Sequence, residues 1–210
     1  RQNFTLKLGP AKAPFFITAD QNYMLYVNGR YVTRGPARGY QASWPYDEVD
    51  LAGYLQKGAN WISIAAYNAG ISTYQYLHQF TAGMICAGVW PGARILSGPG
   101  WKMRLSPGHK PDTARTSRQT NFQEHVDARL DDQSWIHSPK SPRGWLEKFR
   151  TRPFGFMPWA SMEPRNVPLL TNDVLSYQCT CFEAAGRCAD GYETWPNATD
   201  GFRVENPVLK

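Results

Sequence analysis

The sequence has few of the features that mark a membrane, disordered or nucleic-acid-binding protein. Charged residues make up only 19% of its 210 residues, and no apolar run approaches the roughly 20 residues that cross a bilayer. Its 23 Lys and Arg residues outnumber the 17 Asp and Glu residues, but they are spread along the chain without a basic helix. With 42% hydrophobic residues the chain can bury a core, so we expect a folded protein with neither a membrane span nor a nucleic-acid partner.

The common sequence signatures of catalysis are missing as well. There is no Gly-x-Ser-x-Gly elbow, no His-Glu-x-x-His helix and no Gly-rich phosphate loop, and the four histidines are scattered. Hydrolysis of a glycosidic bond usually needs two carboxylates about 5 to 10 Å apart. The two acidic pairs that could supply them are Asp47 with Asp50 and Glu124 with Asp127. Both pairs lie beside predicted turns or strands, where capping, or ion pairing with Arg129 or Lys57, accounts for them, so we predict no catalytic residue.

Cysteine is scarce, and its spacing argues against a zinc site. The four cysteines are Cys86, Cys179, Cys181 and Cys188. A Cys-x-Cys pair followed by six residues and a lone Cys does not match paired Cys-x-x-Cys or Cys/His ligands. An even number, with three in a short C-terminal segment, favours disulfides in an oxidising compartment, with three connectivities open. We expect Cys188 to pair with Cys179 or Cys181, and we predict no metal site.

Two further features bear on the compartment. The sequons Asn3-Phe4-Thr5 and Asn197-Ala198-Thr199 make Asn3 and Asn197 candidate glycosylation sites. No signal peptide is present, and the chain begins at Arg1 without a methionine, which indicates that it was processed, truncated or cut from a longer protein. Together with the cysteines, these features predict a secreted or periplasmic location.

The pattern that is present is one of many short strands. Each β-rich run is bounded by Gly or Pro, of which the chain has 18 and 16, and no helix longer than two turns is indicated. The expected strands are two runs between 4 and 17, then 23–27, 31–33, 61–67, 82–89, 93–96, 101–105 and an edge strand at 123–126. A single helical turn at 52–55 can be capped by Asp50, and 131–135 reads as a turn anchored by Trp135. This pattern predicts an all-β antiparallel sandwich or jelly roll with long loops and an irregular C-terminal tail.

A hairpin and the loop after it stand out within this pattern. The stretch YMLYVNGRYVTRGPARGY, residues 23–40, contains Asn28-Gly29, the preferred pair of a type I′ turn. The loop that follows carries planar cations and aromatic rings that no core requires, and a second aromatic cluster lies at 74–90. Aromatic planes can stack on a pyranose ring while Arg binds hydroxyls or a carboxylate. The candidate carbohydrate-binding residues are Arg34, Arg38, Tyr40, Trp44, Tyr74 and Trp90.

The order of several weak motifs resembles a known family. The N-terminal part of the succession is Phe16-Ile17-Thr18-Ala19-Asp20, Tyr23-x-Leu25-Tyr26-Val27-Asn28-Gly29, Arg34-Gly35-Pro36, Tyr46-Asp47-x-x-Asp50-Leu51, Tyr54-Leu55 and Gly58-x-Asn60-x-Ile62. It continues with Gln123-Glu124-x-x-Asp127-x-Arg129, Asp132 to Trp135, Pro158-Trp159 and Pro164-Arg165-Asn166-Val167-Pro168. This succession resembles the N-terminal β-sandwich of glycoside hydrolase family 78 α-L-rhamnosidases and similar galactose-binding-like, sugar-binding jelly rolls. The resemblance covers about residues 4 to 170.

The resemblance implies an accessory domain of a larger secreted or periplasmic hydrolase that acts on rhamnose-containing glycans. It places a β-sandwich at 1–170 and a cysteine-containing tail or linker at 171–210, leading to further domains of a longer parent chain. Related sandwiches that bind rhamnose can use calcium, but Tyr67-Asn68-Ala69-Gly70 replaces the Gly-Trp-rich segment expected there. We therefore predict no cofactor, with calcium as the open alternative.

Two other functions are compatible with the same residues. The chain could be an autonomous carbohydrate-binding module, or a self-contained polysaccharide-degrading enzyme such as a lyase. The aromatic residues could also pack the sandwich against a neighbouring domain instead of a glycan, because interfaces are enriched in Trp, Tyr and Arg.

Overall fold

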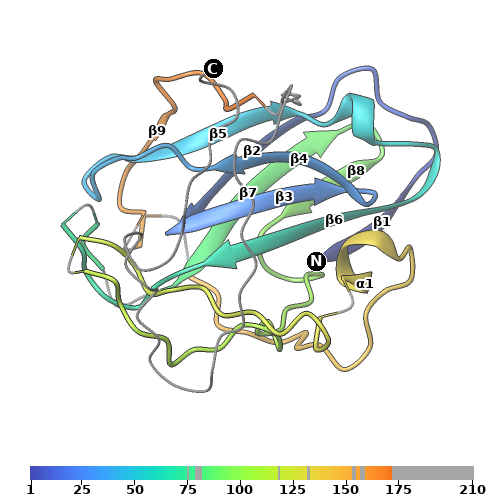
Figure 1. Cartoon of the computed structure of the whole chain (residues 1–210). Helices are drawn as coiled ribbons and strands as arrows, with labels where there is room; N and C mark the ends of the chain where they lie inside the picture. The colour runs from blue at the N-terminus through green and yellow to red at the C-terminus, as the bar shows by residue number, and fades with distance from the viewer. Residues whose placement is uncertain are drawn as a thin grey trace, which may run out of the picture. The chain divides into compact units, whose positions relative to one another are not determined.

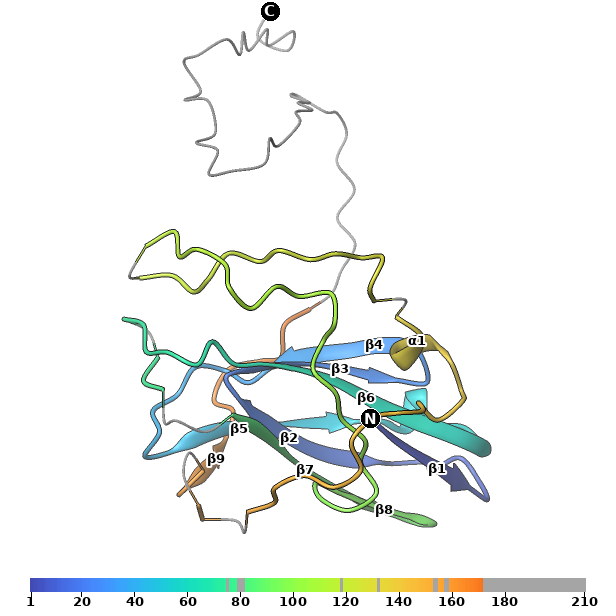
Figure 2. The ribbon, with the colours of Figure 1, turned by 90° about the horizontal axis from the view of Figure 1, so that it is seen from below.

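A computed structural model describes residues 1–74, 76–78, 82–117, 119–131, 133–152, 155–156 and 159–171. In this part of the chain two β-sheets pack face to face, which confirms the predicted β-sandwich (Figures 1 and 2). Residues 1–170 form one compact unit. The predicted disulfide residues Cys179, Cys181 and Cys188 and the sequon at Asn197 lie outside the described residues, so those predictions stand untested.

The first sheet has four antiparallel strands in the order β1-β6-β3-β4. Its strands are β1 (Gln2–Leu6), β3 (Asn22–Val27), β4 (Arg30–Gly35) and β6 (Gly58–Tyr67). The second sheet has the order β8-β7-β2-β5-β9, and its strands are β2 (Pro14–Asp20), β5 (Trp44–Asp50), β7 (Gly83–Trp90), β8 (Ala93–Leu96) and β9 (Met162–Pro164). The short β9, which the sequence pattern did not indicate, pairs in parallel with β5.

The β3–β4 hairpin turns at the predicted Asn-Gly pair. Asn28 has φ 51° and Gly29 has φ 81°, the positive values that a type I′ turn needs at both central residues. The Asn28 side chain also fixes the turn, since its amide donates to the Tyr54 carbonyl at 2.9 Å and its oxygen accepts from the Trp61 N–H at 2.9 Å. The hairpin prediction is therefore confirmed.

Alternating apolar residues from both sheets form the core. Phe15, Ile17, Leu25 and Ile62 are at most 1% exposed, and all four belong to one buried cluster between the sheets. In β3 and the first half of β2 the buried residues alternate with exposed or half-buried neighbours, as the two-residue period of a strand requires. This period is the pattern from which the strands were predicted.

A strand-poor segment at 97–161 follows the sandwich. Figure 2 shows its first part on the side of the four-stranded sheet. The strands predicted at 101–105 and 123–126 are wrong, because those residues form only isolated bridges, such as Met103 with Leu146 and His109 with Val126. Without a continuous ladder partner, these runs do not become strands.

Two short helices complete the described fold. The 3₁₀ helix η1 (Ala52–Tyr54) lies where one helical turn was expected, and Asp50 Oδ1 accepts the Ala52 N–H at 2.9 Å. The helix α1 (Ser134–His137) lies where a turn was predicted, and Trp135 anchors it with an edge-to-face contact to Tyr26. No helix in the described ranges is long and apolar enough to span a membrane.

Candidate functional site

A cleft of about 540 Å³ lies beside the loop that the sequence singled out. Its size falls within the roughly 300–1,000 Å³ of typical ligand pockets. The walls come from four parts of the chain that are distant in sequence: the β2–β3 junction, the β4–β5 loop with the start of β5, the segment after β6, and the strand-poor segment. The lining residues are Gln21, Asn22, Pro36, Ala37, Arg38, Gly39, Trp44, Thr73, Tyr76, Gln119, Thr120 and Asn121.

Trp44 forms a buried wall of the cleft. Only 3% of the residue is exposed, its indole N–H donates to the Ala19 carbonyl at 3.3 Å, and its ring meets Tyr76 edge to face. Trp44 therefore holds strand β5 and the cleft wall together, and it does not present a free face for stacking.

A buried polar network supports the same wall. Asp20 is 1% exposed and accepts a hydrogen bond from the Tyr76 hydroxyl, while the Asn68 amide donates to the Asp20 carbonyl at 3.1 Å. Burial raises the pKa of the Asp20 carboxyl, and the Tyr76 hydrogen bond opposes this shift. Burial, followed by the contact with Asp20, raises the pKa of Tyr76. The network thus fixes Tyr76 at the cleft as a neutral phenol.

Two lining side chains carry buried oxygen atoms that no described residue satisfies. These are Gln21 Oε1 and Asn121 Oδ1. A third such atom is Oδ2 of Asp20, next to Gln21 in the chain. A buried acceptor without a partner costs about 1–3 kcal/mol, so a ligand hydroxyl that reached Gln21 Oε1 or Asn121 Oδ1 would offset that cost.

The structure brings together only some of the predicted carbohydrate-binding residues. Arg38 and Trp44 line the cleft. Tyr40 and Tyr74 do not line the cleft, but each directly follows a lining residue in the chain. Tyr40 is 86% exposed and Tyr74 is 77% exposed. Arg34 is exposed on β4 and is not part of the cleft.

Trp90 is a core residue, which corrects its assignment to the sugar site. It is 6% exposed and packs edge to face against Phe4 and Phe15 between the sheets. This role was not predictable from the sequence, because a Trp at the end of a strand can be a core or a surface residue.

The carboxylates considered for catalysis all have structural partners. Asp47 is fully buried, where it pairs with Arg165 Nε at 2.5 Å and accepts a hydrogen bond from Tyr23. Asp50 accepts hydrogen bonds from the N–H groups of Ala13 and Ala52. These bonds, the one from Ala52 first, lower the pKa of Asp50. Backbone contacts therefore take the place of the suggested pairing with Lys57.

The second acidic pair lies in the strand-poor segment, where Glu124 is exposed and Asp127 is half-buried. Hydrogen bonds from Arg129 lower the pKa of Asp127 to about 2, as the expected Asp127–Arg129 ion pair implies. Glu124 lies 3.1 Å from His109 Nε2. Asp127 is therefore engaged in a local ion pair, and Glu124 in a polar contact with His109.

The remaining predicted sites concern metal, disulfide and glycan attachment. No group of three or more His, Cys, Asp or Glu side chains in the described ranges could hold a metal ion. Cys86 is a free, buried thiol, and burial raises its pKa to about 12. Asn3 is exposed on β1, and its side-chain amide donates to the Pro139 carbonyl at 3.0 Å, a bond that a glycan would displace.

Sequence reasoning missed Gln21 and Asn121. The polar run Asp20-Gln21-Asn22 at a strand junction could have drawn attention to Gln21, because polar residues there end one strand and begin another. Asn121 gave no comparable signal, since it lies in a segment without apolar periodicity.

Comparison with known proteins gives matches only among solved structures. No family model matches the sequence, and no curated protein matches it. The GH78 family rhamnosidase of Bacillus sp. GL1 matches 80% of this chain with a TM-score of 0.74 and 30% identity. The α-L-rhamnosidases of Streptomyces avermitilis and Dictyoglomus thermophilum match 75% and 78% of the chain with TM-scores of 0.50 and 0.56 and identities of 20% and 16%.

The matches concern one region of much longer proteins. This chain spans only 18%, 13% and 18% of those three chains, respectively. The two more distant structures share the fold alone, whereas the Bacillus enzyme also shares nearly a third of the aligned residues. The predicted resemblance to a β-sandwich region of GH78 α-L-rhamnosidases is confirmed.

Proposed function

We propose that this chain is a non-catalytic, carbohydrate-binding β-sandwich domain of a longer glycoside hydrolase that acts on rhamnose-containing glycans. The similarity to one region of GH78 rhamnosidases supports the parent enzyme. The cleft beside Trp44 is the proposed saccharide site.

The observation that carries the proposal is the pair of unsatisfied oxygens in that cleft. Sugar hydroxyls are hydrogen-bond donors as well as acceptors, so they can satisfy Gln21 Oε1 and Asn121 Oδ1. Arg38, which also lines the cleft, supplies guanidinium donors for sugar oxygens. The exposed rings of Tyr40 and Tyr74 flank the lining residues and can cover the apolar face of a further sugar unit.

The partners of the carboxylates support a binding role over a catalytic one. A glycosidase needs one carboxyl free to donate a proton and a second free to act as nucleophile or base. Asp47 is occupied by Arg165 and Tyr23, and Asp127 by Arg129. In this proposal, catalysis belongs to other domains of the parent chain, and the enzyme is secreted or periplasmic like a typical glycan hydrolase.

Titration calorimetry of the chain with a rhamnose-containing oligosaccharide tests the binding site. We expect weak binding that Arg38→Ala reduces at least about fivefold, the loss of roughly 1 kcal/mol that one hydrogen bond supplies. Arg34→Ala is the matched control, because Arg34 is exposed on the same hairpin arm but outside the cleft. Flat titrations would contradict the glycan site and favour a contact with a neighbouring domain.

A hydrolysis assay tests the accessory role separately. The chain alone should not release the aryl group from an aryl α-L-rhamnoside, while the longer parent protein should. Turnover by the isolated chain that is lost on replacing Glu124 or Asp127 would contradict the proposal and favour a compact enzyme.

A further inference from the structure

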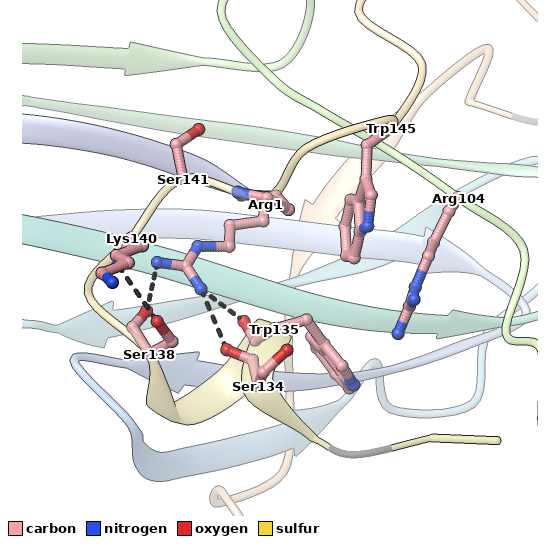
Figure 3. A pocket seen from close by; sticks show the side chains of 9 residues that line it. Arg1, Arg104, Ser134, Trp135, Ser138, Lys140, Ser141 and Trp145 are labelled. Carbon is pink, nitrogen blue, oxygen red and sulfur yellow. Dashed lines mark hydrogen bonds between the residues drawn. The ribbon is translucent and has the colours of Figure 1, made fainter.

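A second, smaller cavity lies between the start of β1 and the strand-poor segment (Figure 3). It measures about 150 Å³ and shares no lining residue with the cleft described above. Three cationic side chains reach it: Arg1, Arg104 and Lys140. No carboxylate occurs among its described lining residues.

Arg1 is a buried cation held by neutral groups. The residue is 4% exposed, and its guanidinium donates to the carbonyls of Ser138 at 2.6 Å and Trp135 at 3.0 Å, and to Asn3 Oδ1 at 3.1 Å. No described carboxylate lies within ion-pair distance of it. Burial accordingly lowers the pKa of Arg1 to about 10. Burying a charge without a counter-charge is costly. An anion beside Arg1 would therefore lower the free energy of the folded state.

The other two cations approach the cavity from different directions. Arg104 lies against the Trp145 ring, 4.9 Å from its centroid (Figure 3). It reaches Asp131 only at 3.5 Å. Lys140 is exposed and has no described ion-pair partner. Ser138 and Ser141 add hydroxyl groups to the lining.

The size of the cavity limits what can enter it. Its volume equals about five times the roughly 30 Å³ that a water molecule occupies in the liquid, and lies well below that of a drug-sized ligand pocket. A group of one central atom with three or four oxygens fits, whereas a complete sugar ring with its hydration does not. The charge of the lining requires that group to be an anion.

We propose that this pocket binds a small oxyanion: a sulfate, phosphate or carboxylate group. The anion supplies the counter-charge that Arg1 lacks and contacts Lys140 as well, while Arg104 adds positive charge from the other end of the pocket and the Ser138 hydroxyl donates to an anion oxygen. The same chemistry could come from a free inorganic ion or from an acidic group carried by a glycan.

Thermal melts of the complete chain test the proposal. Sodium sulfate, sodium phosphate and sodium glucuronate are each titrated against sodium chloride at matched ionic strength, which removes general screening. We expect at least one of the three to raise the Tm beyond chloride, with saturation in the millimolar range, because a ligand stabilises the state that binds it. A larger saturable rise with glucuronate identifies a sugar carboxylate as the source, and a larger saturable rise with sulfate or phosphate identifies an inorganic or ester group, because the general stabilisation by these salts does not saturate.

Two single substitutions locate the effect. Lys140→Ala and Arg104→Gln should each weaken the response about tenfold or more, and Lys140→Arg should retain it. Arg94→Ala, which removes an exposed arginine from β8, is the matched control and should respond like the unaltered chain. If Arg104→Gln does not fold because its contact with Trp145 is lost, the Lys140 variants still show whether the pocket binds the anion. Equal melting in all salts, or an undiminished response in Lys140→Ala, would overturn the proposal.

Discussion

The sandwich and the strand-poor segment are held in place by different interactions. Across residues 2–96 the strands form continuous ladders, and a shared buried cluster fills the space between the sheets. In residues 97–161 the described residues form only isolated bridges. Side chains of the sandwich donate hydrogen bonds to backbone carbonyls of α1. Trp61 donates to Ile136 at 2.6 Å, and Ser63 donates to Trp135 at 2.7 Å.

This difference separates global from local stability. A buried side chain of the sandwich contributes to the whole cooperative unit, whereas one hydrogen bond to α1 fixes only the segment around it. Both proposed sites need the two regions together, because each is lined by residues from the sandwich and from the strand-poor segment. Loss of either region should therefore remove binding, and loss of the sandwich should also unfold the protein.

The largest effect is expected from Asp47→Ala. This change leaves Arg165 and Tyr23 without their shared buried carboxylate, and breaking a buried ion pair costs about 3–5 kcal/mol. Chemical denaturation should show a loss of that size. Glu48→Ala, at the exposed neighbouring position of β5, is the control and should change stability by under about 0.5 kcal/mol. Similar losses in both variants would mean that the buried pair does not stabilise the sandwich.

A smaller loss is expected from Gly29→Val in the hairpin turn. A β-branched residue at φ 81° is strained, and its added atoms meet His137 and the Ile136 carbonyl, so we expect a loss of at least about 1 kcal/mol. Gly144→Val in the strand-poor segment has a similar φ of 73° but open space around it. Thermal melts should therefore show a larger drop for Gly29→Val, and an unchanged Tm would contradict the turn geometry.

Ser63→Ala should have a local effect. The Ser63 hydroxyl is fully buried, and its bond to the Trp135 carbonyl contributes about 1 kcal/mol. Hydrogen exchange should accelerate at the amides of α1 while the core strands stay protected. Thr113→Ala removes an exposed bond of similar length within the strand-poor segment and should leave α1 unaffected. Uniformly faster exchange throughout the sandwich would contradict the separation of the two regions.

The smallest effect is expected from Asp20→Asn, and it should depend on pH. Because burial raises the pKa of Asp20 in the folded state, ionisation of this carboxyl opposes folding. The stability that its neutral form provides is present below the model-peptide value of 3.8 and is lost as pH rises through the higher folded pKa. The neutral variant should therefore melt slightly above the parent at pH 7, and the difference should vanish near pH 3.

Asp50→Asn provides the opposite sign. The backbone N–H of Ala52 lowers the Asp50 pKa, so its ionised form favours folding and its contribution is present above 3.8. This variant should melt at or below the parent at pH 7 and approach it as pH falls. The same pH trend for both substitutions would contradict the assigned environments.

The fold could be predicted where local pattern and global packing agree. Alternation at 23–27 and the Asn28-Gly29 turn both specify the hairpin, so the sequence was sufficient there. At 101–105 the same kind of apolar run fails to form a strand, because Met103 finds only a single bridge with Leu146. The partner of a strand is not encoded in the strand itself, and β9 was missed for the same reason.

The cleft was predictable only in part. Arg38 and Trp44 were found because charged and aromatic residues in a Gly/Pro-rich loop are unusual, although burial gives Trp44 a supporting role instead of a stacking one. Asn121 could not be found, since only the folded chain brings it into the same cleft as Gln21, about a hundred positions earlier in the sequence.

The central claim is that the cleft beside Trp44 holds a saccharide, and a nuclear magnetic resonance titration tests it most directly. A ¹⁵N-labelled sample titrated with a rhamnose-containing oligosaccharide reports on individual amide groups, including the side chains of Gln21 and Asn121. We predict saturable shifts of these two side-chain amides and of the backbone amides at 37–39, with the β8 amides unmoved. Unchanged spectra, or shifts confined to residues outside the cleft, would contradict the account.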